Sequence, residues 1–131
     1  MKIECGTDII EIGRIKEAIE KGGMVFLNKI FSPLEQEYCE QKRTARFQSY
    51  AVRFAAKEAV CKAFGTGMTG VFFNEIEVVC DSDSGKPHVV FYGRAKKLFE
   101  SYDGASLSIS LSHSESFANA IAVLLIPVKA S

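Results

Sequence analysis

The stretch TARFQSYAVRFAAKEAVCKAF, residues Thr44–Phe64, decides how this chain folds. Apolar side chains recur in it every three or four residues and trace one helical stripe, and Gly65 follows as a stop signal. The members of the stripe are Phe47, Tyr50, Ala51, Phe54, Ala55, Ala59 and Ala63. The spacing therefore predicts a long central helix over 44–64 that buries this stripe against the rest of the protein.

The residues before this helix predict one strand and two shorter helices. Residues 2–12 are rich in isoleucine and predict a strand, although Gly6 interrupts the pattern. Residues 14–21 place apolar side chains on one helical face ahead of two glycines, which predicts a short helix. The segment Ser32-Pro33-Leu34-Glu35 combines an N-cap serine, a proline at the first helical position and the glutamate of a capping box, so a helix should run from there to about Gln41.

The residues after the central helix predict a loop, a hairpin, a helix and two strands. Three glycines within 65–70 predict a flexible loop. The segments 75–80 and 88–92 flank a stretch rich in turn-forming residues and predict a hairpin. A basic helix over 94–101 and strands over 105–112 and 117–126 complete the pattern. This order predicts an α+β fold in which an antiparallel sheet packs on the long central helix.

The composition indicates one folded domain spanning residues 1–131, with 47% hydrophobic and 24% charged residues. Sixteen lysines and arginines balance sixteen acidic residues, so we expect neither nucleic acid nor a membrane as partner. The longest apolar run is far shorter than the roughly 20 residues of a membrane span. Four cysteines without a C-x-x-C pair argue against structural zinc. Without a signal peptide pattern, the thiols should stay reduced in the cytoplasm.

Two charged residues interrupt the apolar stripe of the central helix. Glu58 follows Phe54 by four residues and Lys62 follows Glu58 by four, so all three share a face. Most pairs with this spacing are ordinary surface ion pairs. Here the stripe turns the face inward, where a carboxylate and an ammonium need partners such as a metal ion or a phosphate.

A third charged residue, Asp8, stands in the otherwise apolar first strand, where aspartate is disfavoured. Taken alone, Asp8 is as consistent with an ordinary edge-strand position or the start of a turn as with a functional role. Together with Glu58 and Lys62 it would form the kind of site that Mg²⁺ uses, with carboxylate ligands and substrate phosphates. Nothing local in the sequence brings Asp8 to Glu58, so this pairing is a hypothesis.

Two common catalytic patterns are absent. Ser112-His113 ends a predicted strand, but a serine hydrolase of the nucleophile-elbow type would need a G-x-S-x-G turn. The glycine-rich loop over 65–70 lacks the G-K-[ST] sequence of a P-loop. The sequence therefore favours neither a serine hydrolase nor a P-loop nucleotide-binding protein.

Three motifs together resemble those of the 4'-phosphopantetheinyl transferases. Gly6-Thr7-Asp8 resembles the G-x-D motif of this family, with Thr7 where an aliphatic residue is common. Residues 54–62, FAAKEAVCK, match the motif F/W-x-x-K-E-[AS]-x-x-K. Ser110-Leu-Ser-His113, followed by Ala-Asn-Ala over 118–120, resembles a third motif. The resemblance covers nearly the whole chain, and the compact length is similar to that of the small bacterial members.

The resemblance implies a Mg²⁺-dependent transfer of 4'-phosphopantetheine from coenzyme A to a serine of apo acyl carrier protein, releasing 3',5'-ADP, in fatty acid biosynthesis. It implies Asp8 and Glu58 as metal ligands and Glu58 and Lys62 as catalytic residues. Lys62 would stabilise charge on the α-phosphate side. Glu58 would take the serine proton, directly or through a metal-bound water. We expect Mg²⁺ and Lys62 to keep the pKa of Glu58 low, which favours the water route.

The resemblance also implies binding residues for both substrates and a homotrimer with sites between subunits. The expected coenzyme A-binding residues are Arg46, Arg53, Lys57, Lys62, Gly85, Lys86, Pro87 and His113. The expected contacts with an acidic, helical carrier protein are Arg14, Met24, Phe26 and Lys29. Two other functions stay open: a non-catalytic oligomeric module that binds an acidic helical partner and keeps Glu58 and Lys62 as a structural ion pair, and a Mg²⁺-dependent nucleotide hydrolase.

Overall fold

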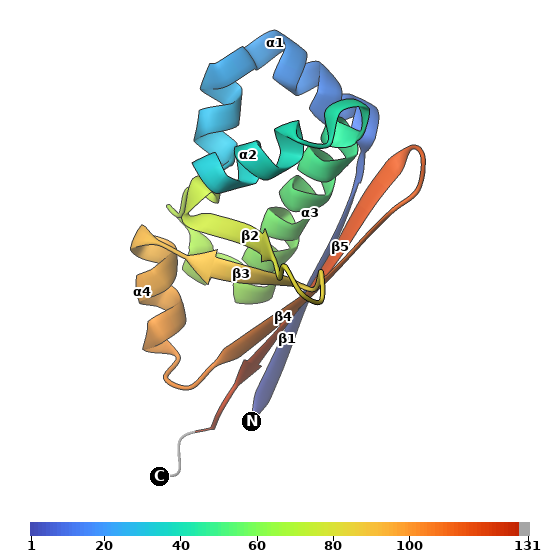
Figure 1. The fold of residues 1–131 in the computed structure, drawn as a ribbon. Coiled ribbons are helices and arrows are strands. Elements are labelled where there is room, and N and C mark those ends of the chain that lie inside the picture. The colour runs from blue at the N-terminus through green and yellow to red at the C-terminus, as the bar shows by residue number, and fades with distance from the viewer. Residues whose placement is uncertain (129–131) are drawn as a thin grey trace.

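A three-stranded antiparallel sheet carries the long helix α3 (Arg46–Phe64) on one face in the computed structural model, which describes residues 1–128 (Figure 1). The strands of this sheet are, in spatial order, β1 (Lys2–Glu11), β5 (Phe117–Ile126) and β4 (Ser106–His113). A separate antiparallel hairpin consists of β2 (Ile76–Cys80) and β3 (Pro87–Phe91). The other helical segments are α1 (Ile12–Ile30), α2 (Pro33–Glu40), α4 (Gly93–Ser101) and the 3₁₀ turns η1 (Arg43–Ala45), η2 (Gly65–Met68) and η3 (Phe73–Glu75).

Helix α3 is the centre of the molecule, as its apolar stripe predicts. It packs between the three-stranded sheet and the β2–β3 hairpin, and one core cluster joins Ala59 and Val60 of α3 to Ile76 of β2 and Ala122 of β5. Eleven of its residues are buried, which is more than one face of a helix provides. The predicted α+β fold with an antiparallel sheet on a long central helix is therefore confirmed.

Small residues let α3 lie unusually close to the sheet. The inner face of β5 presents three buried alanines, at positions 118, 120 and 122. On β1 the corresponding position is Gly6, where an added Cβ would lie only 2.0 Å from the carbonyl oxygen of Ala59. Only glycine fits there, because a side-chain atom would collide with the helix backbone. This close approach brings β1 beside the last turns of α3.

The opposite face of the three-stranded sheet is uncovered in the single chain. Strand residues alternate between the two faces, so Leu107 and Ile109 of β4 face α3 while the serines of this strand, at positions 106, 108, 110 and 112, face outward. Ile9 of β1 and Ile121 of β5 lie on this outer face and are 65% and 44% exposed. The outer face thus combines exposed isoleucines with a row of serines.

The helices differ from the sequence-based expectation at two glycine-rich points. Gly23, with φ 56° and ψ −143°, interrupts α1 as predicted, but a second helical section follows because Leu27 and Phe31 are buried against the core. The segment after α3 was expected to be a flexible loop, and it forms the turn η2 instead. Within residues 1–128, no helix combines the length and the apolarity that crossing a membrane requires.

Candidate functional site

The close packing of β1 on α3 brings Asp8 to Lys62. The Lys62 ammonium donates to Asp8 Oδ1 at 3.1 Å and to the carbonyl oxygen of Thr7 at 2.9 Å. The Asp8 side chain is 18% exposed and that of Lys62 is 54% exposed, so the pair lies at the surface edge of the helix–sheet contact. The two residues are far apart in sequence and meet only because Gly6 permits the approach.

Glu58 lies one helical turn before Lys62 and is half-buried. Burial raises the pKa of Glu58, the nearby Asp8 carboxylate raises it further, and Lys62 opposes the shift. The low pKa expected for Glu58 applies to the metal-bound cluster, whereas burial and, second to it, the Asp8 carboxylate act in the opposite direction in the chain alone. Asp8, Glu58 and Lys62 are called the carboxylate cluster below.

The carboxylate cluster offers hard oxygen donors to a cation. Asp8 and the Thr7 carbonyl already hold one positive charge, the Lys62 ammonium, so their oxygens are oriented for a cation. No group of three or more His, Cys, Asp or Glu side chains in residues 1–128 is placed to hold a metal ion. Two carboxylates suit Mg²⁺, which usually completes its coordination with water and substrate phosphates.

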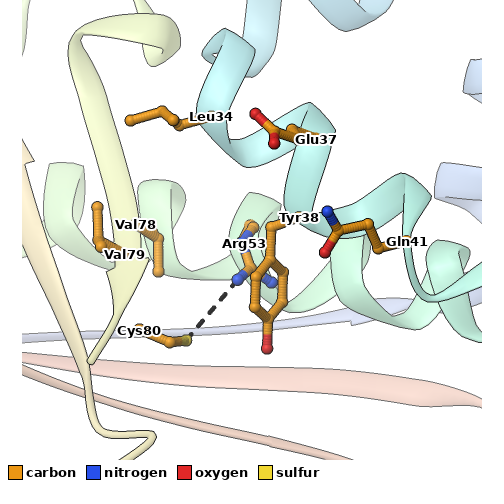
Figure 2. A pocket seen from close by; sticks show the side chains of 8 residues that line it. All are labelled: Leu34, Glu37, Tyr38, Gln41, Arg53, Val78, Val79 and Cys80. Atoms are coloured by element: carbon orange, nitrogen blue, oxygen red, sulfur yellow. Dashed lines mark hydrogen bonds between the residues drawn. The ribbon is translucent and has the colours of Figure 1, made fainter. Parts of the chain in front are cut away.

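Arg53 occupies a different position, beneath Tyr38 of α2. Its guanidinium carbon lies 4.3 Å from the centre of the Tyr38 ring, and its side chain donates to Ser49 and to Cys80 Sγ. Figure 2 shows this arrangement in the pocket between α2 and β2, where the dashed line joins Arg53 to Cys80. Arg53 is only 3% exposed, and its Nε–H is buried without a partner. The guanidinium therefore retains a free donor.

A second cavity shares Arg53, Tyr38 and Cys80 with that pocket and extends toward β4. It is lined in addition by Gly85, Pro87 and His113, three of the residues that the family resemblance implies as contacts of coenzyme A. Lys42 and Ser49 also line it, so the cavity combines cationic groups and hydroxyl or amide donors. It is called the Arg53 cavity below. Its composition suits a phosphorylated ligand.

The carboxylate cluster and the Arg53 cavity lie on opposite sides of α3. Successive residues of a helix are turned by about 100°, so the direction midway between positions 49 and 53 is about 180° from that between 58 and 62. Lys62 accordingly reaches β1, whereas Arg53 faces α2 and the end of β2. One copy of the chain therefore presents the two groups on different flanks of the molecule.

Lys57 was expected to contact coenzyme A, but the structure buries it in the core. Its side chain is fully buried and donates to Glu35 Oε1 at 2.7 Å, to the Phe73 carbonyl at 3.0 Å and to the Ile76 carbonyl. All three ammonium protons are thus used inside the protein, so none is left for a phosphate of coenzyme A. Burial lowers the pKa of Lys57, and the Glu35 carboxylate opposes this shift. Lys57 is a core residue in this structure.

Sequence reasoning missed the other members of this buried network. Glu35 caps α2, as predicted, but its second oxygen also accepts from the Val78 N–H, which ties α2 to β2. Ser32 donates to Glu77, which also accepts from the Tyr92 hydroxyl. The capping box was the only signal for Glu35. No sequence signal marks Tyr38 or Cys80 as cavity residues.

Two further residues expected at coenzyme A lie outside the Arg53 cavity. Arg46 stacks on Phe47, lies 3.8 Å from Glu40, and lines a hollow between α1, α2 and α3 instead. Lys86 lines a neighbouring hollow with His88 and Leu107. In the single chain, neither side chain joins Arg53 and His113.

The residues expected to contact a carrier protein all lie on α1. Arg14 and Lys29 are exposed near its two ends, and Met24 is 60% exposed just after the break at Gly23. Phe26 is half-buried and packs against the core. Three of the four side chains are therefore available to a partner.

Comparison with known proteins gives a consistent result. A family model described as "4'-phosphopantetheinyl transferase superfamily" matches residues 4–121. Holo-[acyl-carrier-protein] synthase of Ruminiclostridium cellulolyticum is 52% identical over 125 residues, covering 95% of this chain and 92% of that protein.

Solved structures agree in fold over almost the entire chain. The Chronobacterium ammoniagenes ACPS–CoA complex superposes with a TM-score of 0.83 at 33% identity, covering 98% of this chain and 100% of the other. A Bacillus anthracis holo-(acyl-carrier-protein) synthase in complex with CoA (3',5'-ADP) gives 0.74 at 36% identity, covering 92% and 94%.

Proposed function

The chain belongs to the 4'-phosphopantetheinyl transferase superfamily, and we propose that it transfers 4'-phosphopantetheine from coenzyme A to a serine of an apo acyl carrier protein, releasing 3',5'-ADP. The observation that carries the proposal is the meeting of Asp8 with Lys62, one turn from Glu58, at the edge of the helix–sheet contact. The relatives named for this reaction match over nearly the full length. Fatty acid biosynthesis and the cytoplasm are the expected setting.

Each member of the carboxylate cluster has a role in this reaction. Asp8 and Glu58 would hold Mg²⁺, which supplies positive charge to the donor diphosphate when bound. Lys62 adds a mobile positive charge on the same side and stabilises the leaving 3',5'-ADP as negative charge develops. Glu58 accepts the proton of the carrier serine, directly or through water, a role worth typically a factor of 10² to 10⁴ in rate.

The Arg53 cavity is proposed to bind the nucleotide part of coenzyme A. Arg53 and Lys42 bring positive charge to the cavity wall, and His113 adds a further polar group. Charge-assisted hydrogen bonds from such groups are the usual means of holding phosphates. Gly85 and Pro87 also line the cavity, and the adenine ring is proposed to lie against them.

A complete site then requires two copies of the chain. The carboxylate cluster and the Arg53 cavity lie on opposite flanks of α3, so a single donor molecule would have to span the helix to reach both. Each interface between copies in a ring joins one flank of a subunit to the other flank of its neighbour. The exposed isoleucines on the outer face of the sheet offer an apolar surface for this assembly. We therefore propose a homotrimer with the site between subunits.

Mixing two inactive variants tests the shared site. Glu58→Gln disables the carboxylate cluster on one flank of α3, and Arg53→Gln disables the Arg53 cavity on the other. If each site forms between two subunits, about a quarter of the sites in an equal mixture of the co-expressed variants contain an intact carboxylate cluster and an intact Arg53 cavity. The mixture should then regain about a quarter of wild-type activity. A mixture no more active than its separate components would show that each copy carries its own site. If Arg53→Gln fails to fold, the exposed His113→Ala replaces it.

The carrier protein is proposed to dock along α1, where Arg14 and Lys29 are exposed. Charge reversal by Arg14→Glu should raise KM for the acidic carrier at least several-fold while KM for coenzyme A stays unchanged. Lys97→Glu reverses an exposed charge on α4 and serves as the control. An equal effect of both variants on carrier KM would contradict docking on α1.

The transfer itself is tested by mass spectrometry of an apo carrier protein incubated with the chain and coenzyme A, with Mg²⁺ or with excess chelator. A Mg²⁺-dependent phosphopantetheine increment on the carrier serine is the expected result, and Glu58→Gln should abolish it. Consumption of coenzyme A without a carrier would favour the nucleotide hydrolase instead. Carrier binding without any increment would favour the non-catalytic module.

A further inference from the structure

The Lys62 ammonium is bound to Asp8, one of the two carboxylates that would hold the metal ion. It contacts Asp8 Oδ1 and the Thr7 carbonyl at 3.1 and 2.9 Å, which uses two of its three protons on oxygens of β1. A carboxylate oxygen and a carbonyl oxygen are also the ligands preferred by hard divalent cations. Two positive charges cannot share Asp8 at these distances without strong repulsion.

We propose that Lys62 is a built-in competitor of the divalent cation, holding Asp8 until metal and donor bind together. This inference rests on the proposed function, because it uses the metal and the diphosphate of that reaction. The Lys62 side chain is 54% exposed and carries a flexible four-carbon stem, so the ammonium can move outward while the backbone of α3 stays fixed. In leaving Asp8, it becomes free to contact a phosphate of the donor.

The charges of the cluster favour this exchange. With both carboxylates ionised, Asp8, Glu58 and Lys62 carry one net negative charge. A divalent cation alone would turn this into one net positive charge, and the doubly charged diphosphate of the donor restores the original value. Metal binding should therefore be weak without donor and tighter with it, and this coupling is reciprocal.

Mn²⁺ binding, followed by EPR of the free ion, tests the exchange without any turnover. Removing the competing charge in Lys62→Met should tighten Mn²⁺ binding in the absence of coenzyme A by about 3- to 10-fold. Lys62→Arg keeps the charge and should bind Mn²⁺ like the wild type. Lys97→Met, which removes an exposed charge on α4, controls for overall charge. Asp8→Asn should weaken binding in every background.

Coenzyme A provides the second readout. After correction for Mn²⁺ held by free coenzyme A, the donor should tighten Mn²⁺ binding more in the wild type than in Lys62→Met, because only the wild type has an ammonium to displace. Unchanged or weaker Mn²⁺ affinity in Lys62→Met without donor would overturn the inference.

Carrier modification by the wild type, measured in parallel, separates the inference from the proposed function. Modification without the affinity gain in Lys62→Met overturns the exchange and leaves the transfer intact. The affinity gain without carrier modification supports the exchange and overturns the transfer.

Discussion

Position 6 of β1 accepts no side chain. An added Cβ would lie 2.0 Å from the Ala59 carbonyl oxygen and 2.8 Å from the Ala63 nitrogen, and both are backbone atoms of α3 that cannot move independently. Gly6→Ala should therefore push β1 from the helix and lower the free energy of unfolding by about 3 kcal/mol, the upper end of overpacking effects. Urea denaturation measures this loss.

The matched control for this substitution is Gly13→Ala. Position 13 has no atom within 4 Å of an added Cβ and lies in α1, where alanine is favoured over glycine. This variant should keep or slightly raise stability. Equal losses in the two variants would mean that the close approach of β1 to α3 does not explain the glycine of the G-x-D motif.

We expect the thiol of Cys39 to make stability depend on pH above pH 9. Burial raises the pKa of Cys39 from 9.0 to about 11, against the opposing charge of Arg53. The unfolded chain ionises this thiol near pH 9 while the folded chain keeps it protonated, so the contribution is intact below pH 9 and is lost between about pH 9 and 11. At pH 10.5 the loss should reach about 2 kcal/mol, since each pKa unit corresponds to about 1.4 kcal/mol.

Unfolding free energies at pH 8 and pH 10.5 under reducing conditions check this prediction. Cys39→Ala should be less stable at pH 8, because it leaves a cavity, but it should lose less stability on going to pH 10.5. An identical pH-dependent loss in the wild type and in Cys39→Ala would assign the alkaline instability to other groups.

The Lys57–Glu35 pair joins three elements, α3, α2 and β2, through fully buried charges. Lys57→Met leaves the Glu35 carboxylate buried without its counter-charge and should cost about 3 to 5 kcal/mol of unfolding free energy. Adding Glu35→Gln removes the unpaired charge and keeps a carbonyl acceptor, so the double variant should recover part of the loss.

An exposed ion pair provides the comparison. Lys21 and Glu17 are paired at 2.7 Å on the surface of α1, the same distance as the buried pair. Lys21→Met should change stability by less than about 0.5 kcal/mol, because surface pairs are screened by water. If Lys57→Met and Lys21→Met lost the same unfolding free energy, burial would not explain the contribution of Lys57 to stability.

Local sequence signals predicted the helices and strands far better than the tertiary contacts between them. The capping box at Ser32 gives the start of α2, and the apolar stripe gives α3 almost to the residue. The second section of α1 was missed, because Gly23 ends the local pattern and only tertiary burial of Leu27 restores a helix. Propensity carries no information about such long-range packing.

In the candidate site, too, local spacing was predictable and tertiary contact was not. Glu58 and Lys62 share a face by spacing alone, but the approach of Asp8 depends on the packing of Gly6 against α3. Lys57 was misassigned because charge in a motif does not reveal whether it meets solvent or a buried carboxylate. Motif resemblance identified the family, and the structure was needed to show that Lys57 lies in the core.

For the whole molecule, the outer face of the three-stranded sheet is the surface that the proposed trimer would cover. Ile9→Lys places a charge on this face at the edge strand β1, where Ile9 is 65% exposed in the single chain. The folded monomer should therefore tolerate the lysine, whereas an apolar interface between copies would not.

Size-exclusion chromatography with light scattering should find Ile9→Lys as a monomer with a wild-type circular dichroism spectrum, together with loss of transferase activity because the two flanks of α3 no longer meet their partners. Val25→Lys, at an apolar position of α1 that is 80% exposed, should leave the oligomeric state unchanged. An active monomer of Ile9→Lys would place the whole site within one chain. A variant that remains a trimer would move the interface away from this sheet, and the carboxylate cluster would then have to meet the Arg53 cavity across another surface of α3.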